Sequence, residues 1–466
     1  MRHLSDRRTR RSTAMLAVAA LTLAACGDDD ASQDSTSTPA TTVAAEDATP
    51  ETTESMDDMD DMASDTTMAD DMDDMDDIST DTTMADDMDD MDDMATPTTD
   101  DGASTLRAGL TSLLQEHVYL AGITIETAVD AGGDLETPAV QAAVATLDAN
   151  SVALSEAVGS VAGPENGEAF LGLWREHIGF FVDYTLARAT GDDAAAEQAR
   201  ADLDGYKQAA GAFFEEITAG EIPADALVEN LNGHTETLFA AIDAVVAGDA
   251  TAFDDLRMAA QHMFASALAL STGISAAAPE MFPGDVTSAP AETRAVLTNL
   301  LQEHVYLAGI ALEQAVEAGG DLEAPAVQAA VATLDANSVA LSEVVGSVAG
   351  AENGEAFLGL WREHIGFFVD YTLGVATGDQ AAADQARADL DGYKQAAGAF
   401  FEEITAGELP ADALVESLNV HTDTVIATID SLVAGEADVF DNLRTAAQHM
   451  PMAALALSTA IVAATS

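Results

Sequence analysis

Histidine is the residue type in this sequence best suited to chemistry, because a neutral imidazole binds transition metals. Eight of the nine histidines form two sets of four, separated by a constant 187 positions. The sets are His117, His177, His234 and His262, then His304, His364, His421 and His449. Each member of a set lies on a different segment with apolar residues at helical spacing, so four imidazoles could meet inside one bundle. Because imidazole suits zinc, copper, iron and nickel, the pattern predicts a transition-metal site in each repeat.

Carboxylates and sulfurs next to these histidines are accessory candidates. Glutamates directly precede two histidines of each set and methionines directly follow the last one, at Glu116, Glu176, Met263, Glu303, Glu363 and Met450. Adjacent side chains of a helix point about 100° apart, so a Glu-His pair rarely aims both groups at one ion. The Glu-x-x-His, His-x-x-x-His and His-Glu-x-x-His patterns of known metal sites are absent. The alternative is a core histidine hydrogen-bonded to a neighbour such as Tyr119, Tyr184 or Asp183.

A methionine-rich acidic segment is a second candidate for metal chemistry. Residues 27–104 hold 28 acidic groups and no basic or aromatic residue, and ten of the seventeen methionines lie between Met56 and Met94. This composition predicts a disordered linker. Thioethers select Cu(I), so the methionines favour copper capture, whereas the paired aspartates would hold Ca²⁺ only loosely. The other interpretation is a solvating tether that arose by expansion of a short repeat.

The N-terminus has the pattern of an export signal. Five arginines lie within residues 1–12, an apolar stretch covers residues 14–21, and the segment ends at Leu23-Ala24-Ala25-Cys26. This ending resembles the lipobox of bacterial lipoproteins. The resemblance implies a signal peptide over residues 1–25, cleavage before Cys26 and attachment of lipid (palmitate or a similar acyl chain) to that cysteine. We therefore expect an extracytoplasmic protein anchored to the cell membrane by a lipid, with residues 26–104 as the tether.

The remainder predicts an all-α fold built from two tandem copies of one module. Residues 105–278 and 292–466 repeat each other, and a proline-rich linker covers residues 279–291. Glycine and proline breaks predict six helices per copy, which in the first copy cover about 105–130, 138–162, 166–189, 193–218, 223–246 and 250–276. Short connections predict up-and-down bundles. Segments such as Leu173-Trp174-Arg175-Glu176-His177-Ile178 and Ala260-Gln261-His262-Met263 resemble a family of exported bacterial helical proteins, and the resemblance brings no reaction with it.

Charge narrows the choice of function. The formal net charge is −67 from 83 acidic and 16 basic residues. This charge excludes general nucleic-acid binding, because the protein would repel phosphates, and it would attract cationic ligands and repel anionic ones. There is no P-loop, nucleophile elbow or glycine-rich dinucleotide loop. The leading hypothesis is a non-catalytic lipoprotein that binds a transition metal, copper favoured, through inward-facing histidines. One alternative is a structural lipoprotein without metal that contacts an envelope protein, and another is a metal-dependent redox enzyme with Tyr184 near its metal.

Overall fold

The computed structural model describes residues 98–465, and all regular structure in this range is helical. The first repeat has the six predicted helices, each within four residues of its predicted ends. They are α1 (Gly102–Asp130), α2 (Pro138–Ala162), α3 (Pro164–Thr190), α4 (Asp193–Ile217), α5 (Ala224–Ala247) and α6 (Ala252–Ala277). The breaks act as expected. Gly191, for example, ends α3 in the left-handed conformation with φ 72°, which a residue without Cβ adopts at little cost.

The second repeat has the same helices, but its last one is divided. They are α7 (Ala289–Glu317), α8 (Pro325–Ala349), α9 (Ala351–Thr377), α10 (Gln380–Ile404), α11 (Ala411–Ala434), α12 (Val439–Gln448) and α13 (Met450–Thr465). The division follows from Pro451, which has no N–H for the carbonyl of the preceding turn. Phe264 occupies the matching position in the first repeat, and α6 runs through it unbroken. Helix α7 begins inside the segment that the sequence assigned to the linker.

The up-and-down order gives each repeat an inner and an outer set of helices. Each helix packs against the next along the chain, and α6 packs back against α1. The alternate helices α1, α3 and α5 also contact one another, while α2, α4 and α6 lie between them. Because successive helices are antiparallel, α1, α3 and α5 run in the same direction. Helices α7, α9 and α11 form the matching inner set of the second repeat.

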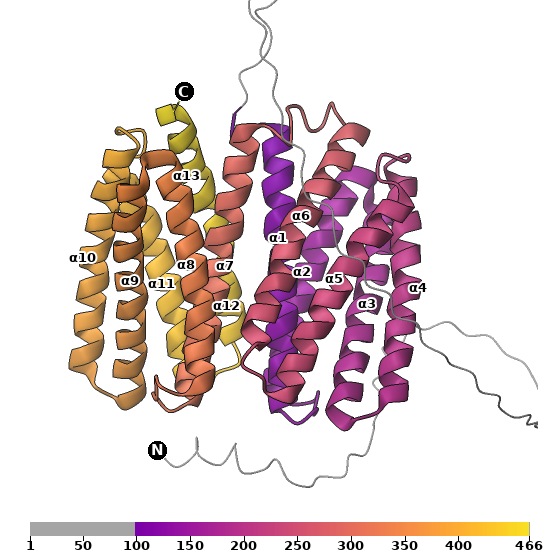
Figure 1. The fold of residues 1–466 in the computed structure, drawn as a ribbon, viewed down its shortest axis with the longest axis horizontal. Coiled ribbons are helices and arrows are strands. Elements are labelled where there is room, and N and C mark those ends of the chain that lie inside the picture. The colour runs from indigo at the N-terminus through magenta and orange to yellow at the C-terminus, as the bar shows by residue number, and fades with distance from the viewer. Residues whose placement is uncertain (1–97, 466) are drawn as a thin grey trace, which may run out of the picture. The chain divides into compact units, whose positions relative to one another are not determined.

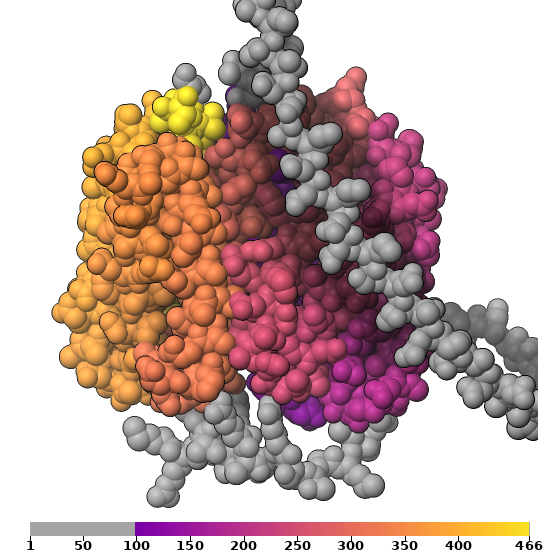
Figure 2. Space-filling model, in the orientation of Figure 1, coloured from indigo at the N-terminus to yellow at the C-terminus, as the bar shows by residue number. Residues whose placement is uncertain are grey.

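The two repeats pack side by side in one compact unit, with α1 against α7 (Figures 1 and 2). Tyr119 of α1 stacks on Tyr306 of α7, with ring centroids 5.2 Å apart. The same contacts are made in both directions across this interface. Thr146 donates to Asp441 at 2.6 Å, and the equivalent Thr333 donates to Asp254 at 2.6 Å. The interface is therefore approximately two-fold symmetric, as expected when duplicated modules pair through the same face.

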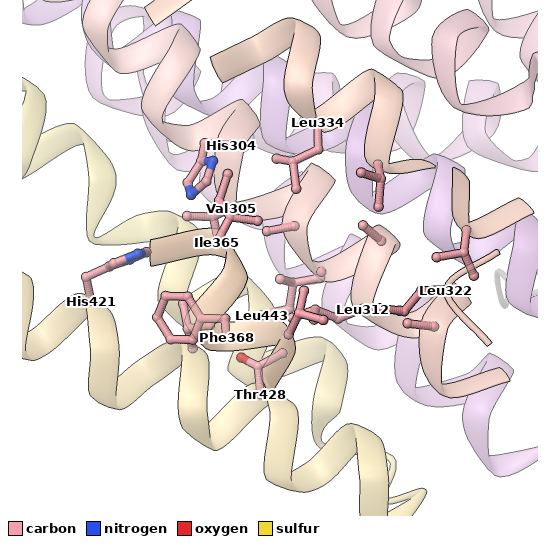
Figure 3. Close-up of a pocket in the computed structure, with 18 residues that line it drawn as sticks. His304, Val305, Leu312, Leu322, Leu334, Ile365, Phe368, His421, Thr428 and Leu443 are labelled. Carbon is pink, nitrogen blue, oxygen red and sulfur yellow. The ribbon is translucent and has the colours of Figure 1, made fainter. Parts of the chain in front are cut away.

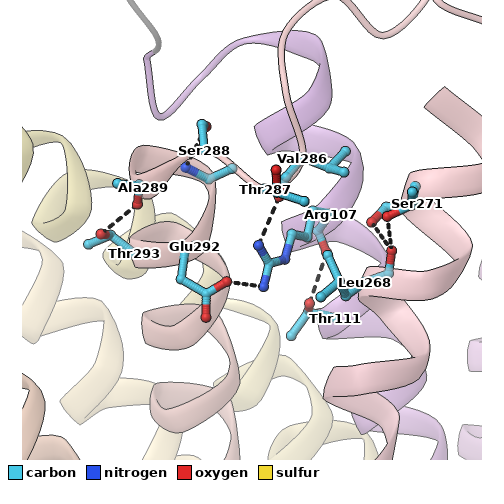
Figure 4. A network of polar contacts seen from close by, with 12 residues as sticks. Arg107, Thr111, Leu268, Ser271, Val286, Thr287, Ser288, Ala289, Glu292 and Thr293 are labelled. Carbon is cyan, nitrogen blue, oxygen red and sulfur yellow. Dashed lines mark hydrogen bonds and ion pairs between the residues drawn. The ribbon is translucent and has the colours of Figure 1, made fainter. Parts of the chain in front are cut away.

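The connection between the repeats is held by a buried arginine (Figure 4). Arg107 of α1 is 1% exposed, donates to the carbonyl of Val286 at 2.8 Å and forms an ion pair with Glu292 of α7. A single guanidinium thus joins the first helix of one repeat to the connecting segment and to the first helix of the other. Because the guanidinium is planar and donates to partners on both sides, it fixes the position of the two helices relative to each other.

Two further sequence features concern the ends of the chain. Residues 439–465 are long and apolar enough to cross a membrane by length and composition, but 44% of the relevant window is buried within the protein. This stretch packs against α7 and α11, as α6 packs against α1 and α5. The proposed lipidation site Cys26, the signal segment and the methionine-rich segment lie outside the described residues.

Candidate metal centres

The inner helices of the first repeat bring three histidines together. His117 of α1, His177 of α3 and His234 of α5 each offer one ring nitrogen, and the three nitrogens lie within 4.8 Å of one another. The Nε2 atoms of His117 and His177 are 3.4 Å apart. Two nitrogens bound at about 2.0–2.1 Å to one tetrahedral ion would be separated by about 3.4 Å. The spacing of these two nitrogens therefore suits two ligands of one ion, and in the absence of an ion it is the spacing of a hydrogen bond between the two rings.

The second repeat reproduces the arrangement with His304 of α7, His364 of α9 and His421 of α11. Its Nε2–Nε2 separation, between His304 and His364, is 3.3 Å. We call these clusters triad 1 and triad 2. The arrangement of the inner helices explains both triads. Three parallel helices that contact one another share a common axis, and a buried side chain at the same height on each helix points toward that axis. Each triad can hold a metal ion through three imidazoles.

Both triads are buried, and their pKa values are lowered accordingly. In triad 1 all three side chains are less than 5% exposed. Desolvation, followed by the neighbouring His234, lowers the pKa of His117 to about 3, and desolvation with His262 lowers that of His234 to about 4. The pKa of His177 falls well below its ordinary value for the same first reason, with His117 and His234 adding to it. The imidazoles are therefore neutral at physiological pH, with lone pairs available to a metal.

Aromatic rings enclose each triad. The centroid of the Trp174 ring lies 4.7 Å from the ring centroid of His117 and 4.5 Å from that of His177. The Tyr206 ring stacks on His177 with a centroid separation of 4.8 Å. Phe181 closes another side, 6.2 Å from His234. The sequence reading missed Tyr206 as a neighbour of the site. Its signal was the recurrence of the residue at Tyr393, where the same stacking occurs on His364 at 4.7 Å.

The fourth histidine of each set does not join its triad, so the expectation that four converge is corrected to three. The Nε2 atom of His262, on α6, lies 3.0 Å from the carbonyl oxygen of Asn230. His449, between α12 and α13, lies 3.1 Å from the carbonyl of Ser417. Both are half-buried, His262 on the outer helix α6 and His449 at the junction of α12 and α13. An apolar helix face predicts burial but does not tell an inner helix from an outer one.

The accessory carboxylates serve other purposes. Glu116 accepts hydrogen bonds from Arg444 at 2.7 Å and Tyr306 at 3.4 Å, both from the other repeat. Glu303 reciprocally accepts from Arg257 at 3.0 Å and from Tyr119 at 3.1 Å. These glutamates point into the interface between the repeats, where Arg257 pairs with Glu303 and Arg444 with Glu116. Glu176 and Glu363 are exposed.

The remaining sequence candidates also lie apart from the triads. Met263 and Met450 are buried in the apolar core on α6 and α13, which contribute no triad histidine. Tyr184, a candidate partner for a core histidine, instead donates to Asp243 at 3.1 Å and accepts from Arg200 at 3.2 Å. Within residues 98–465, neither Nδ1 of His117 nor Nδ1 of His234 has a hydrogen-bond partner. The facing atoms of His117 and His177 are Nε2, so an ion bound between them would leave the Nδ1 atoms as they are.

The lowered pKa of His234 predicts a specific pH dependence of stability in the metal-free protein. Since its folded pKa is about 4 and its unfolded pKa about 6.5, only the unfolded state takes up the proton between these values. Folding stability relative to a His234→Leu variant should fall by about 1.4 kcal/mol per pH unit from about pH 6.5 to 4 and be constant above 7. Urea denaturation of both proteins across this range measures the difference. Groups remote from triad 1, such as Glu126 with its pKa raised to about 7 by burial, cancel in the comparison.

Comparison of the chain with known protein families, curated proteins and solved structures finds no match.

Proposed function

We propose that the protein binds one copper ion, as Cu(I), in each of its two triads. The observation that carries the proposal is the convergence of three neutral, buried imidazoles on one point, repeated in the second module with a nearly equal Nε2–Nε2 distance. Imidazole is a ligand for zinc, copper, iron and nickel, so ligand type alone leaves a choice.

Charge argues for the monovalent ion. Glu116 is already paired with Arg444, Glu303 is paired with Arg257, and Glu176 and Glu363 are exposed, so none of these carboxylates offsets the charge of a bound ion. The cost of burying an ion grows with the square of its charge, so a divalent ion meets roughly four times the penalty of Cu(I) in the same site. Three nitrogens suit a d¹⁰ ion without strong geometric demands, a class that includes both Cu(I) and Zn²⁺, so the charge of the ion decides between these two.

The rest of the sequence is consistent with copper handling outside the cytoplasm. The methionine-rich segment offers thioether ligands that select Cu(I), and the strongly negative charge would concentrate cations near the protein. The lipobox-like ending at Cys26 supports a lipid anchor on the outer side of the cell membrane. In this proposal the methionine-rich tether collects copper and the bundles hold it in their interiors.

Copper stoichiometry in full-length variants tests the proposal. Titration of the reduced protein with Cu(I) against a colorimetric chelator should show two ions that depend on the triads. A His117→Leu/His177→Leu double variant should lose one of them, and adding His304→Leu and His364→Leu should remove both. Copper held by the methionine segment is unaffected by these changes and forms the common baseline.

The matched control is His262→Leu/His449→Leu, which removes the same number of imidazoles from outside the triads and should retain both ions. If the triad variants bind as much copper as the wild type, the proposal is wrong and the histidines are core residues. Zinc, iron and nickel measured in parallel identify a different ion if one is preferred.

A further inference from the structure

Triad 2 adjoins a cavity that two of its histidines line. The cavity has a volume of about 50 Å³ and is bounded by segments of α7, α8, α9, α11 and α12. His304 and His421 stand at one end of it and Leu322 at the other (Figure 3). A water molecule needs about 10–15 Å³ measured in this way, so the space admits a molecule of two or three heavy atoms.

The walls of this cavity are almost entirely hydrocarbon. They include Val305, Leu312, Leu334, Phe368, Val425 and Leu443. Apart from the two histidines, the polar side chain in the wall is Thr428, whose hydroxyl already donates to the carbonyl of Thr424 at 3.0 Å. A charged or strongly hydrated ligand would lose its water without compensation here, whereas a small neutral molecule would not.

A smaller cavity in the first repeat shares part of this lining, at the positions equivalent to Gly309, Leu312, Val425, Thr428 and Leu443. This cavity of about 10 Å³ lies beside Gly122 and Leu238, and none of its lining residues is a histidine. Four lining positions differ between the repeats. Val425 and Ala311 are smaller than their equivalents Leu238 and Thr124, Leu312 is an isomer of Ile125, and Thr428 is larger than Ala241. Val425 and Ala311 therefore open space in the second repeat, while Thr428 fills part of it. One methylene is enough to matter in a close-packed interior.

We infer that a small uncharged ligand of diatomic size, of the class of carbon monoxide and dioxygen, reaches the open coordination position of the ion in triad 2 through this cavity. The first repeat holds its ion closed to such ligands. The inference rests on the proposed metal binding. In this inference the two modules have different roles. Triad 1 only binds its ion, whereas the ion in triad 2 can also bind a second small molecule.

Carbon monoxide is the probe for this inference, because it binds Cu(I) reversibly and its stretching frequency reports the site. Infrared titration of the copper-loaded full-length protein should show one carbonyl band that depends on triad 2. Val425→Leu, which installs the residue of the first repeat, should reduce carbon monoxide affinity at that band at least tenfold. The matched variant Leu238→Val should create a second band from triad 1.

Copper content measured in the same samples separates the two proposals. Two triad-bound ions with a carbonyl band that Val425→Leu leaves unchanged, or with equal bands from both triads, overturns the inference and leaves metal binding intact. Absence of triad-bound copper overturns both. Circular dichroism verifies the fold of each variant, and xenon binding to the metal-free protein, followed by ¹²⁹Xe NMR and weakened by Val425→Leu, verifies that the substitution fills the cavity.

Discussion

The copper-loaded protein should be more stable than the metal-free protein by about 4 kcal/mol for each filled triad, when the free ion is present at about 1,000 times its dissociation constant. Only the folded chain brings together His117, His177 and His234, which are far apart in the sequence. An ion that binds the native state and not the unfolded state stabilises the former by mass action. Chemical denaturation with and without Cu(I) measures the increment.

The variants His234→Leu and His262→Leu form a matched pair for this experiment. The first should lose about half of the total increment, because triad 1 is broken and triad 2 remains. The second should keep the whole increment, although loss of the contact with Asn230 lowers the baseline stability of both forms. Equal increments in the two variants would show that copper stabilises the protein from somewhere other than the triads.

A second large effect is expected at the interface between the repeats. Arg257 donates to both carboxylate oxygens of Glu303, at 3.0 and 3.2 Å, and the Glu303 side chain is 0% exposed. Arg257→Met keeps the apolar stem and removes the charge, which leaves a buried carboxylate without its counter-ion. Breaking a buried pair in this way typically costs about 3–5 kcal/mol, and we expect that loss in the free energy of unfolding.

Arg175→Met is the matched control, because Arg175 also makes two hydrogen bonds to one carboxylate, that of Asp148. This pair is 46% and 42% exposed, so its removal should cost less than about 1 kcal/mol. Adding Glu303→Gln to Arg257→Met should recover part of the loss, since the buried group is then neutral. Similar losses in both single variants would mean that the interface pair contributes no more than a surface pair.

The fold was largely predictable because local signals agree with the tertiary structure. Gly191 and Gly248 end helices in left-handed conformations, and Pro138 begins one where its missing N–H costs nothing. The same signals recur in both copies, which predicted the repeat and its six-helix pattern. The division of the last helix at His449 was not predicted. It follows from Pro451, which replaces Phe264 of the first copy.

The site was predictable only in part, because the relevant geometry is not local. Helical spacing placed His117 and His262 alike on apolar faces, yet only the first lies on an inner helix. That distinction depends on which helices contact each other across the bundle. The role of Glu116 depends on Arg444, more than 300 residues away in sequence, and no spacing rule reveals a partner in the other repeat. Triad membership therefore emerges from topology.

The central claim is that three imidazoles of each repeat share one ion, and X-ray absorption spectroscopy of the copper-loaded protein tests it most directly. The spectrum of the variant with His117, His177, His304 and His364 all changed to Leu reports the copper of the methionine-rich segment and is subtracted. We expect the remaining Cu(I) to have a first shell of about three nitrogens at roughly 2.0 Å, with imidazole scattering. This remaining signal per chain should halve in His117→Leu/His177→Leu. A first shell of sulfur or oxygen, unchanged by that double substitution, would place the metal outside the bundles and contradict the account.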